Sequence, residues 1–226
     1  SAGIIAGGES RGSSGYYNTN LVLDGNEIYR IFGNEAAYGI LVEGPVNKYN
    51  DGYSLIEMPD HSENIKIFNN SIREIIPRNE NTYLFGLAVQ SGRLVRSYHT
   101  KIQNFLTSMD NRFRVRNVLV ANNTIVLKND RLKNTGVITN LALMNLKNTR
   151  VLGNALAILD SDIDVEKSTI ASLVTMEGYF PFKPGYVSDR NAYEIGANSP
   201  ASVYRFFETD SSNFIVEYGY HQEYLT

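Results

Sequence analysis

Several residue types and patterns are missing from this chain of 226 residues, and each absence excludes a class of protein. There is no cysteine, which excludes disulfides, thiolate metal sites, iron–sulfur clusters and a cysteine nucleophile. There is no basic excess, because 21 Lys and Arg stand against 24 Asp and Glu, and this argues against a general nucleic-acid-binding protein. The longest apolar runs, such as Leu84 to Val89, are far shorter than the roughly 18–20 residues of a membrane-spanning helix.

What the chain has in excess is asparagine. It contains 25 Asn, together with 15 Tyr and 10 Phe. Asparagine tolerates the left-handed backbone conformation and bonds to its own backbone, so it concentrates in turns, whereas aromatic residues favour strands. The composition therefore predicts β-structure with many tight turns.

Some of these asparagines belong to a short repeated pattern. Each copy has an apolar residue, one free position, Gly or Asn, then Asn, and a small or polar residue before the next apolar one. The copies are Ile31 to Ala36, Ile67 to Ile72, Val120 to Ile125 and Val151 to Leu156. Three copies also have an upstream half, at Asn64 to Ile67, Asn117 to Val120 and Asn148 to Val151, and Ser212 to Val216 resembles a degenerate fifth copy.

A strand, a two-residue corner and a second strand, repeated along the chain, are what a right-handed parallel β-helix needs. Asn34, Asn70, Asn123 and Asn154 would then stack at one corner of successive coils and bond to one another through their side-chain amides. Their separations of 36, 53 and 31 residues imply inserted loops, or an extra coil between Asn70 and Asn123. The candidate insertions are Gly44 to Pro59, Pro77 to Tyr83, Arg93 to Arg112 and Leu127 to Gly136.

Two other interpretations of the pattern stay open. The first is chance recurrence in an Asn-rich chain. The second is an antiparallel sandwich, which also has short strands and turns, although Asp24-Gly25 and Asp51-Gly52 are the only Asp-Gly pairs and there is no Asn-Gly hairpin signal. Helical signal is weak, and Leu94 to Met109 is the best candidate for a short helix.

The expected fold class is all-β, a β-helical solenoid with loop insertions and an aromatic-rich C-terminal cap. Residues 1–23 form a Gly/Ser-rich segment that we expect to loop over an adjoining coil, residues 24–178 form the coils, and residues 179–226 form a terminal coil or cap. Because the chain begins Ser1-Ala2-Gly3 with no Met, we interpret it as one domain that is either cut from a larger polypeptide or a processed product.

From Asp24 to Ile170, on the four asparagine corners, the chain resembles the pectate-lyase-like superfamily of parallel β-helices. The Asn-rich form with large loops is most similar to bacteriophage tailspikes and tail appendages. The resemblance implies a homotrimer on a virion tail that binds, and in many cases cleaves, a bacterial surface polysaccharide. It carries no diagnostic catalytic signature, and the chain lacks the Trp-containing motifs of some pectin-degrading relatives.

Asp160, Asp162 and Asp164 are the best catalytic candidates. They begin like a calcium loop, but Val165 and Ala171 stand where an EF-hand needs Gly and Glu. On a strand, the three carboxylates would share the outer face, roughly 6–7 Å apart between neighbours. Such a pair suits glycoside hydrolysis, with repulsion raising one pKa for the acid role. The alternative is a solvated acidic edge.

A second group of residues suits sugar binding. Glu57, Asp60 and His61 surround a proline turn, and Tyr98 with His99 lies in another insertion, although all five fit an exposed loop equally well. The histidines at 61, 99 and 221 lack metal-ligand spacing, so we expect no metal and no cofactor. The tyrosines of the C-terminal region fit either sugar stacking or an aromatic interface or core cap.

These observations predict a tail-appendage β-helix that recognises a cell-surface glycan. An enzymatic version would also cleave that glycan, as a glycoside hydrolase or polysaccharide lyase. Its expected location is the virion tail or the extracellular space, with no nucleic-acid or membrane partner. A non-catalytic structural or adhesive β-helix, and a secreted polysaccharide lyase or epimerase, are the alternatives.

Overall fold

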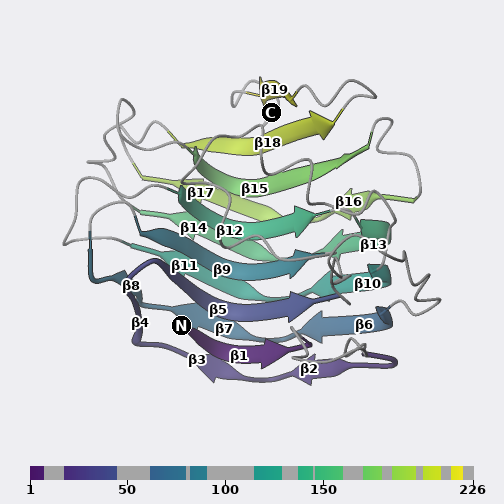
Figure 1. The fold of residues 1–226 in the computed structure, drawn as a ribbon, viewed down its shortest axis with the longest axis horizontal. Helices are drawn as coiled ribbons and strands as arrows, with labels where there is room; N and C mark the ends of the chain where they lie inside the picture. Colours follow the sequence, from purple (N-terminus) through teal and green to yellow (C-terminus); the bar gives the residue numbers. More distant parts are fainter. Residues whose placement is uncertain are drawn as a thin grey trace, which may run out of the picture.

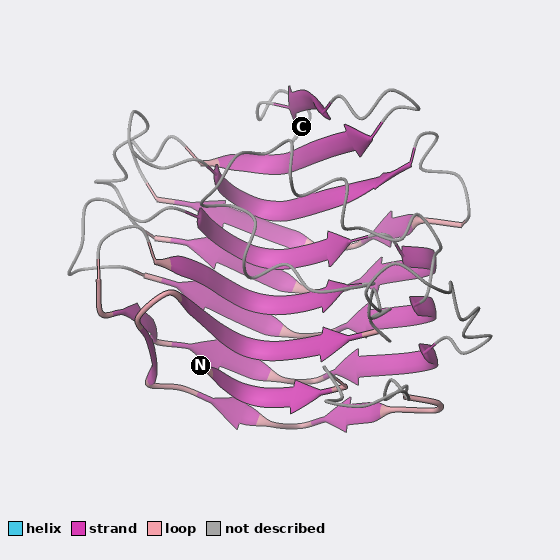
Figure 2. Ribbon diagram, viewed as in Figure 1, coloured by secondary structure: helices cyan, strands magenta, loops and turns pink. Residues whose placement is uncertain are grey.

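The computed structural model describes residues 1–7, 18–44, 62–79, 82–90, 115–128, 137–144, 146–159, 170–179, 185–196, 201–209 and 215–220. Within these ranges the chain is built from strands and turns and has no helix (Figure 2). Accordingly, no helix long and apolar enough to cross a membrane occurs there. The predicted all-β class is confirmed.

The strands form stacked sheets (Figure 1). Sheet 1 has seven strands, in the spatial order β1 (Ala2–Ala6), β5 (Ala36–Glu43), β9 (Tyr83–Gln90), β12 (Val137–Met144), β15 (Ile170–Tyr179), β18 (Ser202–Thr209) and β19 (Ile215–Tyr220). Strand β1 lies within the segment that we expected to be a loop, and it pairs with β5.

Two further sheets of five strands each contain most of the remaining described strands. Sheet 2 contains β2 (Val22–Asp24), β6 (Ser62–Phe68), β10 (Val115–Ala121), β13 (Leu146–Leu152) and β16 (Val187–Asp189). Sheet 3 contains β3 (Glu27–Ile28), β7 (Ser71–Arg73), β11 (Thr124–Leu127), β14 (Ala155–Ile158) and β17 (Ala192–Ile195). A two-stranded sheet joins β4 (Ile31–Gly33) to β8 (Ile75–Pro77).

The chain runs repeatedly through one strand of sheet 1, one of sheet 2 and one of sheet 3, in that order, and we call each such round a passage. The passages run from β1, β2 and β3 to β15, β16 and β17. Neighbouring strands in these sheets pair in parallel, and among the described pairs only β18 with β19 is antiparallel. This pairing contradicts the antiparallel sandwich. Strand β6 pairs directly with β10, so no extra passage lies between Asn70 and Asn123.

The main hydrophobic core contains inward-facing residues from all three of these sheets. Ile65, Val118 and Val151 of sheet 2 and Ile72 and Ile125 of sheet 3 are at most 1% exposed. Full burial of such a side chain contributes about 1.5–3 kcal/mol.

Strands β5, β9 and β12 of sheet 1 are buried on both faces, because their alternate residues form a second apolar cluster. In that cluster the rings of Tyr38 and Phe85 stack with their centroids 4.9 Å apart. Burial on both faces explains why β9 is a nearly continuous apolar run in the sequence. In β12 the run is interrupted by Thr139 and by the buried Asn140, whose Nδ2 donates to the Ile125 and Ala157 carbonyls.

A ladder of asparagine side chains fixes the corner between sheets 2 and 3. We call it the inner ladder, and its members are Asn26, Asn70, Asn123, Asn154 and Asn191. Each Nδ2 donates to the Oδ1 of the next member at 2.8–3.0 Å. The same Oδ1 also accepts a hydrogen bond from the backbone N–H of the donating asparagine. Each passage is thereby held in register with the next.

The structure confirms Asn70, Asn123 and Asn154 as ladder members and corrects Asn34. Asn34 follows β4, where its backbone carbonyl accepts a hydrogen bond from the Thr82 hydroxyl. Asn26 is the member in that passage, and Asn191 extends the ladder beyond Asn154. The degenerate copy around Asn213 begins outside the described residues.

Candidate functional site

The residues proposed from the sequence for catalysis and sugar binding are not described by the structure. They are Asp160, Asp162, Asp164, Glu57, Asp60, His61, Tyr98 and His99. The same holds for the candidate helix Leu94 to Met109. These assignments stay predictions, and the candidate site below is built from other residues.

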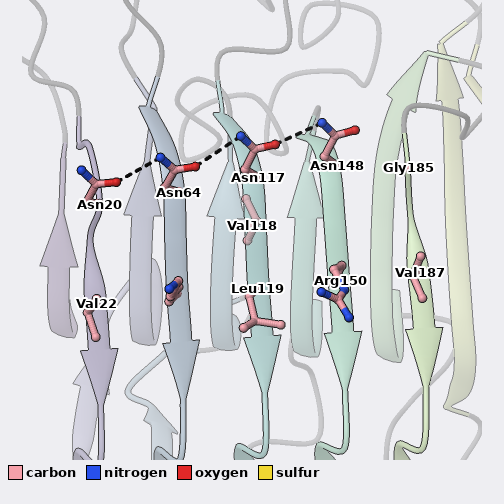
Figure 3. A pocket seen from close by; sticks show the side chains of 11 residues that line it. Asn20, Val22, Asn64, Asn117, Val118, Leu119, Asn148, Arg150, Gly185 and Val187 are labelled. Atoms are coloured by element: carbon pink, nitrogen blue, oxygen red, sulfur yellow. Dashed lines mark hydrogen bonds between the residues drawn. The ribbon is translucent and has the colours of Figure 1, made fainter.

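The outer face of sheet 2 carries a shallow groove of about 590 Å³ (Figure 3). The groove runs across the sheet from β2 to β16. Its lining residues lie within these strands or, for Asn20 and Gly185, just before them. The residues that line it are Asn20, Val22, Asn64, Lys66, Asn117, Val118, Leu119, Asn148, Arg150, Gly185 and Val187. This set contains two cationic side chains and no acidic one.

One side of the groove is a line of asparagines, which we call the outer row: Asn20, Asn64, Asn117 and Asn148. All four have positive φ, between 54° and 58°, a conformation that asparagine accepts more readily than most residues. Their side chains bond in series, each Nδ2 donating to the Oδ1 of the preceding member at 3.0–3.3 Å (Figure 3). Gly185, with φ of 77°, continues the line two residues before β16.

The bonding of the outer row leaves capacity for a ligand. A side-chain amide has two N–H donors and two acceptor lone pairs. Asn64 and Asn117, the inner members of the row, each use one N–H and one lone pair to bond to their neighbours in the row. Asn117, for example, donates to Asn64 and accepts from Asn148. Its second N–H and second lone pair have no partner among the described residues, and Asn117 is exposed. The row therefore presents a line of donors and acceptors to solvent.

Two residues further along each strand lies a second line, the alternating row: Val22, Lys66, Leu119, Arg150 and Val187. The strand register places these five positions side by side across sheet 2. Apolar and cationic side chains alternate along the row. Val22 and Val187 at its ends are 53% and 47% exposed, unusually high for valine.

Three tyrosines that we considered for sugar stacking are placed in the core region instead. Tyr186, Tyr193 and Tyr204 pack against the main hydrophobic core, and the rings of Tyr193 and Tyr204 meet edge to face at 5.7 Å. Burial, reinforced by the neighbouring hydroxyls, raises the pKa of Tyr186 and Tyr193 above the ordinary tyrosine value. These three rings fit the core-cap interpretation.

The chemistry that the described groove offers is binding. It has amide groups, two cations and apolar side chains, without the carboxylate pair on which most glycosidases depend. Among the described residues, no group of three or more His, Asp or Glu side chains could hold a metal ion.

Sequence reasoning found three residues of the outer row, Asn64, Asn117 and Asn148, but treated them only as starts of strands. It missed Asn20 and the whole alternating row. A signal was present, because Lys66, Leu119 and Arg150 each stand two residues after a repeated asparagine.

Comparison of the chain with protein-family models, with curated proteins and with solved structures finds no match.

Proposed function

We propose that this chain is a stretch of right-handed parallel β-helix that binds an extended polysaccharide in the groove of sheet 2. The observation that carries the proposal is the pair of rows that run side by side across sheet 2. Such rows suit a polymer lying along the stack, because they offer side-chain contacts at a regular spacing from one strand to the next.

The fold assignment is supported by the order in which the chain visits the sheets. Each return to a sheet adds a strand parallel to the previous one, as the coils of a β-helix do. Crossover connections between parallel strands of one sheet are nearly always right-handed, which supports the hand. The inner ladder supplies the stacked asparagines that the repeated corner pattern predicts for such coils.

The binding assignment follows from the chemistry of the outer row. Sugar hydroxyls donate and accept, and so do side-chain amides, so an exposed line of asparagines can bond several sugar residues in succession. The apolar members of the alternating row would cover the C–H faces of the rings. The groove volume lies within the ordinary range for ligand sites, about 300–1,000 Å³.

The biological setting that we propose is host attachment by a phage tailspike or tail appendage, with three chains side by side. Sedimentation equilibrium of the purified chain is expected to give the mass of a trimer. A monomer at micromolar concentration would contradict the trimeric setting but not binding in the groove.

Binding is tested by screening the chain against purified bacterial capsular and O-chain polysaccharides on an array, followed by biolayer interferometry with the best ligand. Asn64→Gly with Asn117→Gly removes two central amides from the groove, and glycine accepts the positive φ. The matched control is Asn69→Gly with Asn122→Gly, because these residues also have positive φ, of 57° and 53°, but do not line the groove. We expect the groove variant to lose at least tenfold in affinity, roughly two hydrogen bonds, and the control to bind normally.

Two results would refute the proposal: no binding to any polysaccharide, or equal binding by both double variants. Release of reducing ends from a bound glycan would show cleavage as well. In that case Asp160→Asn with Asp162→Asn tests the acids proposed from the sequence, which are wrong if cleavage persists.

A further inference from the structure

The alternating row has a regularity that general sugar binding does not require. Its order across the sheet is Val22, Lys66, Leu119, Arg150 and Val187, so a cation stands on every second strand. Strands are spaced about 4.8 Å apart, which places the two cationic positions about 9.6 Å from each other along the stack. The apolar side chain of Leu119 lies between them.

The two cations have no anionic partner in the described part of the chain. Neither Lys66 nor Arg150 forms an ion pair there, and both are exposed. Two carboxylates lie further along the neighbouring strands β2 and β16, and each has a side-chain partner. Asp24 accepts a hydrogen bond from Asn69 at 3.0 Å, and Asp189 pairs with Arg190 at 3.4 Å.

The strand starts on the other side of the outer row carry three more charges. Glu63, Arg116 and Lys147 occupy adjacent register positions there, two cations against one acid. The face of sheet 2 is therefore positive along the groove, although the whole chain has a net charge of −3. Because Lys66 and Arg150 form no ion pair among the described residues, this local positive charge points to an anionic ligand.

We propose that the groove selects an acidic polysaccharide in which carboxylate-bearing sugars alternate with neutral ones. This inference rests on the proposed function. In an extended polysaccharide one sugar residue advances the chain by about one strand spacing, so acidic residues at every second position would meet Lys66 and Arg150 in turn. The neutral sugars between them lie over Val22, Leu119 and Val187, and the outer row bonds the hydroxyls along one edge.

The two cations have different roles in this arrangement. The planar guanidinium of Arg150 pairs with a carboxylate through two parallel hydrogen bonds, whereas the ammonium of Lys66 acts as a point charge on a flexible stem. Arg150 therefore fixes the orientation of one acidic sugar, and Lys66 accepts the next one with less geometric demand. Arg150→Lys is expected to weaken binding even though the charge is kept.

The test uses oligosaccharides of matched length in isothermal titration calorimetry at low salt. Hyaluronan fragments alternate acidic and neutral sugars, oligogalacturonate is acidic at every residue, and cello-oligosaccharides are neutral. Inorganic polyphosphate is the fourth probe, a flexible polyanion without sugar rings. We expect hyaluronan fragments to bind at least tenfold more tightly than the other three, with affinity falling as salt screens the charges.

The variants separate charge from shape. Lys66→Gln and Arg150→Gln should each lower the affinity for hyaluronan fragments about tenfold, the scale of one charge-assisted contact. Because the two sites are about 9.6 Å apart, the double variant should lose about 100-fold. The matched control is Arg30→Gln with Arg73→Gln, which removes two charges from ion pairs with Glu74 and Glu27 outside the groove, and it should bind normally.

The outcomes distinguish this inference from the proposed function. If a neutral oligosaccharide binds as tightly as hyaluronan fragments and depends on Asn64 and Asn117 but not on Lys66 and Arg150, the groove binds sugars and the acidic specificity is wrong. If polyphosphate binds best, the positive face is a general polyanion surface and the specificity is again wrong. If no oligosaccharide or polysaccharide binds, the proposed function fails and the inference fails with it.

Discussion

Replacing Asn123 by alanine tests whether the inner ladder holds the passages together. The side chain of Asn123 is fully buried and takes part in four hydrogen bonds. Its Oδ1 accepts from the backbone N–H and the Nδ2 of Asn70, at 3.0 and 2.9 Å. Its Nδ2 donates to the Ile67 carbonyl and to Asn154 Oδ1, both at 3.0 Å.

The expected cost follows from these four contacts. A buried hydrogen bond contributes about 1 kcal/mol net, and a buried group left without a partner costs about 1–3 kcal/mol. The Asn70 amide retains partners at the Leu23 and Phe68 carbonyls, but the backbone N–H of Asn70 loses the side-chain acceptor it has. We therefore expect Asn123→Ala to lower the free energy of unfolding by about 4 kcal/mol, a large share of the roughly 5–15 kcal/mol typical of a domain.

The measurement is urea unfolding followed by far-UV circular dichroism, because the chain has no tryptophan for fluorescence. Asn117→Gly is the matched control, since it removes an asparagine of the exposed outer row at a position with φ of 54°. There water replaces the lost partners, and we expect a change below about 1 kcal/mol. A loss below about 1 kcal/mol for Asn123→Ala would refute the structural role of the ladder.

A double variant sharpens the same test. Asn70→Ala and Asn123→Ala each remove the bond between these two side chains, so the double variant should cost less than the sum by about 1–2 kcal/mol. Strict additivity would show that the two amides do not act as a pair.

Two further predictions concern packing and pH. A Cβ on Gly86 would lie 2.3 Å from Ile125 Cγ2 and 2.7 Å from the Asn140 carbonyl oxygen, so Gly86→Ala should destabilise by about 1–3 kcal/mol in the same unfolding assay. A loss below about 1 kcal/mol for Gly86→Ala would contradict this packing. Because burial raises the pKa of Tyr186 and Tyr193, their contribution to stability is complete below the unfolded tyrosine value of about 10 and declines as pH rises above it. Tyr186→Phe with Tyr193→Phe should flatten the fall of the urea midpoint between pH 9 and 11, and an unchanged slope would show that these hydroxyls are not the cause.

The sequence predicted the strand–corner–strand repeat because the corner has a local chemical requirement. Ile67 to Ile72 and Val120 to Ile125 show Asn-Asn at the corner, and Val151 to Leu156 shows Gly-Asn, with the first residue of each pair at positive φ. The corner of the first passage was misassigned because Ile31 to Ala36 has the same sequence pattern as the true corners. The true corner, Asp24-Gly25-Asn26, resembled a hairpin signal.

Asn191 was missed for a different reason. The residue before it is Arg190, which adopts φ of 56° where the other corners have Gly or Asn. Arginine is uncommon in that conformation, so no local pattern marks this corner. Only the hydrogen bond from Asn154 Nδ2 to Asn191 Oδ1 reveals it.

The groove was not predicted because it joins residues far apart in the chain. Lys66 and Arg150 belong to one row because β6, β10 and β13 pair without a shift. A shift by one residue would turn such side chains toward the core. The repeated asparagines align these positions in the sequence, but the paired strands are needed to show that Lys66 and Arg150 lie together on the exposed face.

The ladders explain how the groove stays regular while the passages differ in length. Consecutive members of the inner ladder from Asn26 to Asn191 are separated by 44, 53, 31 and 37 residues. Their amide contacts nevertheless stay within 2.8–3.0 Å. Register is thus set by contacts at the corner and not by the length of the connections, whose entropic cost grows only slowly with length. Insertions between passages can therefore change without moving the outer and alternating rows, which leaves the groove of sheet 2 intact while the lengths of the connections diverge.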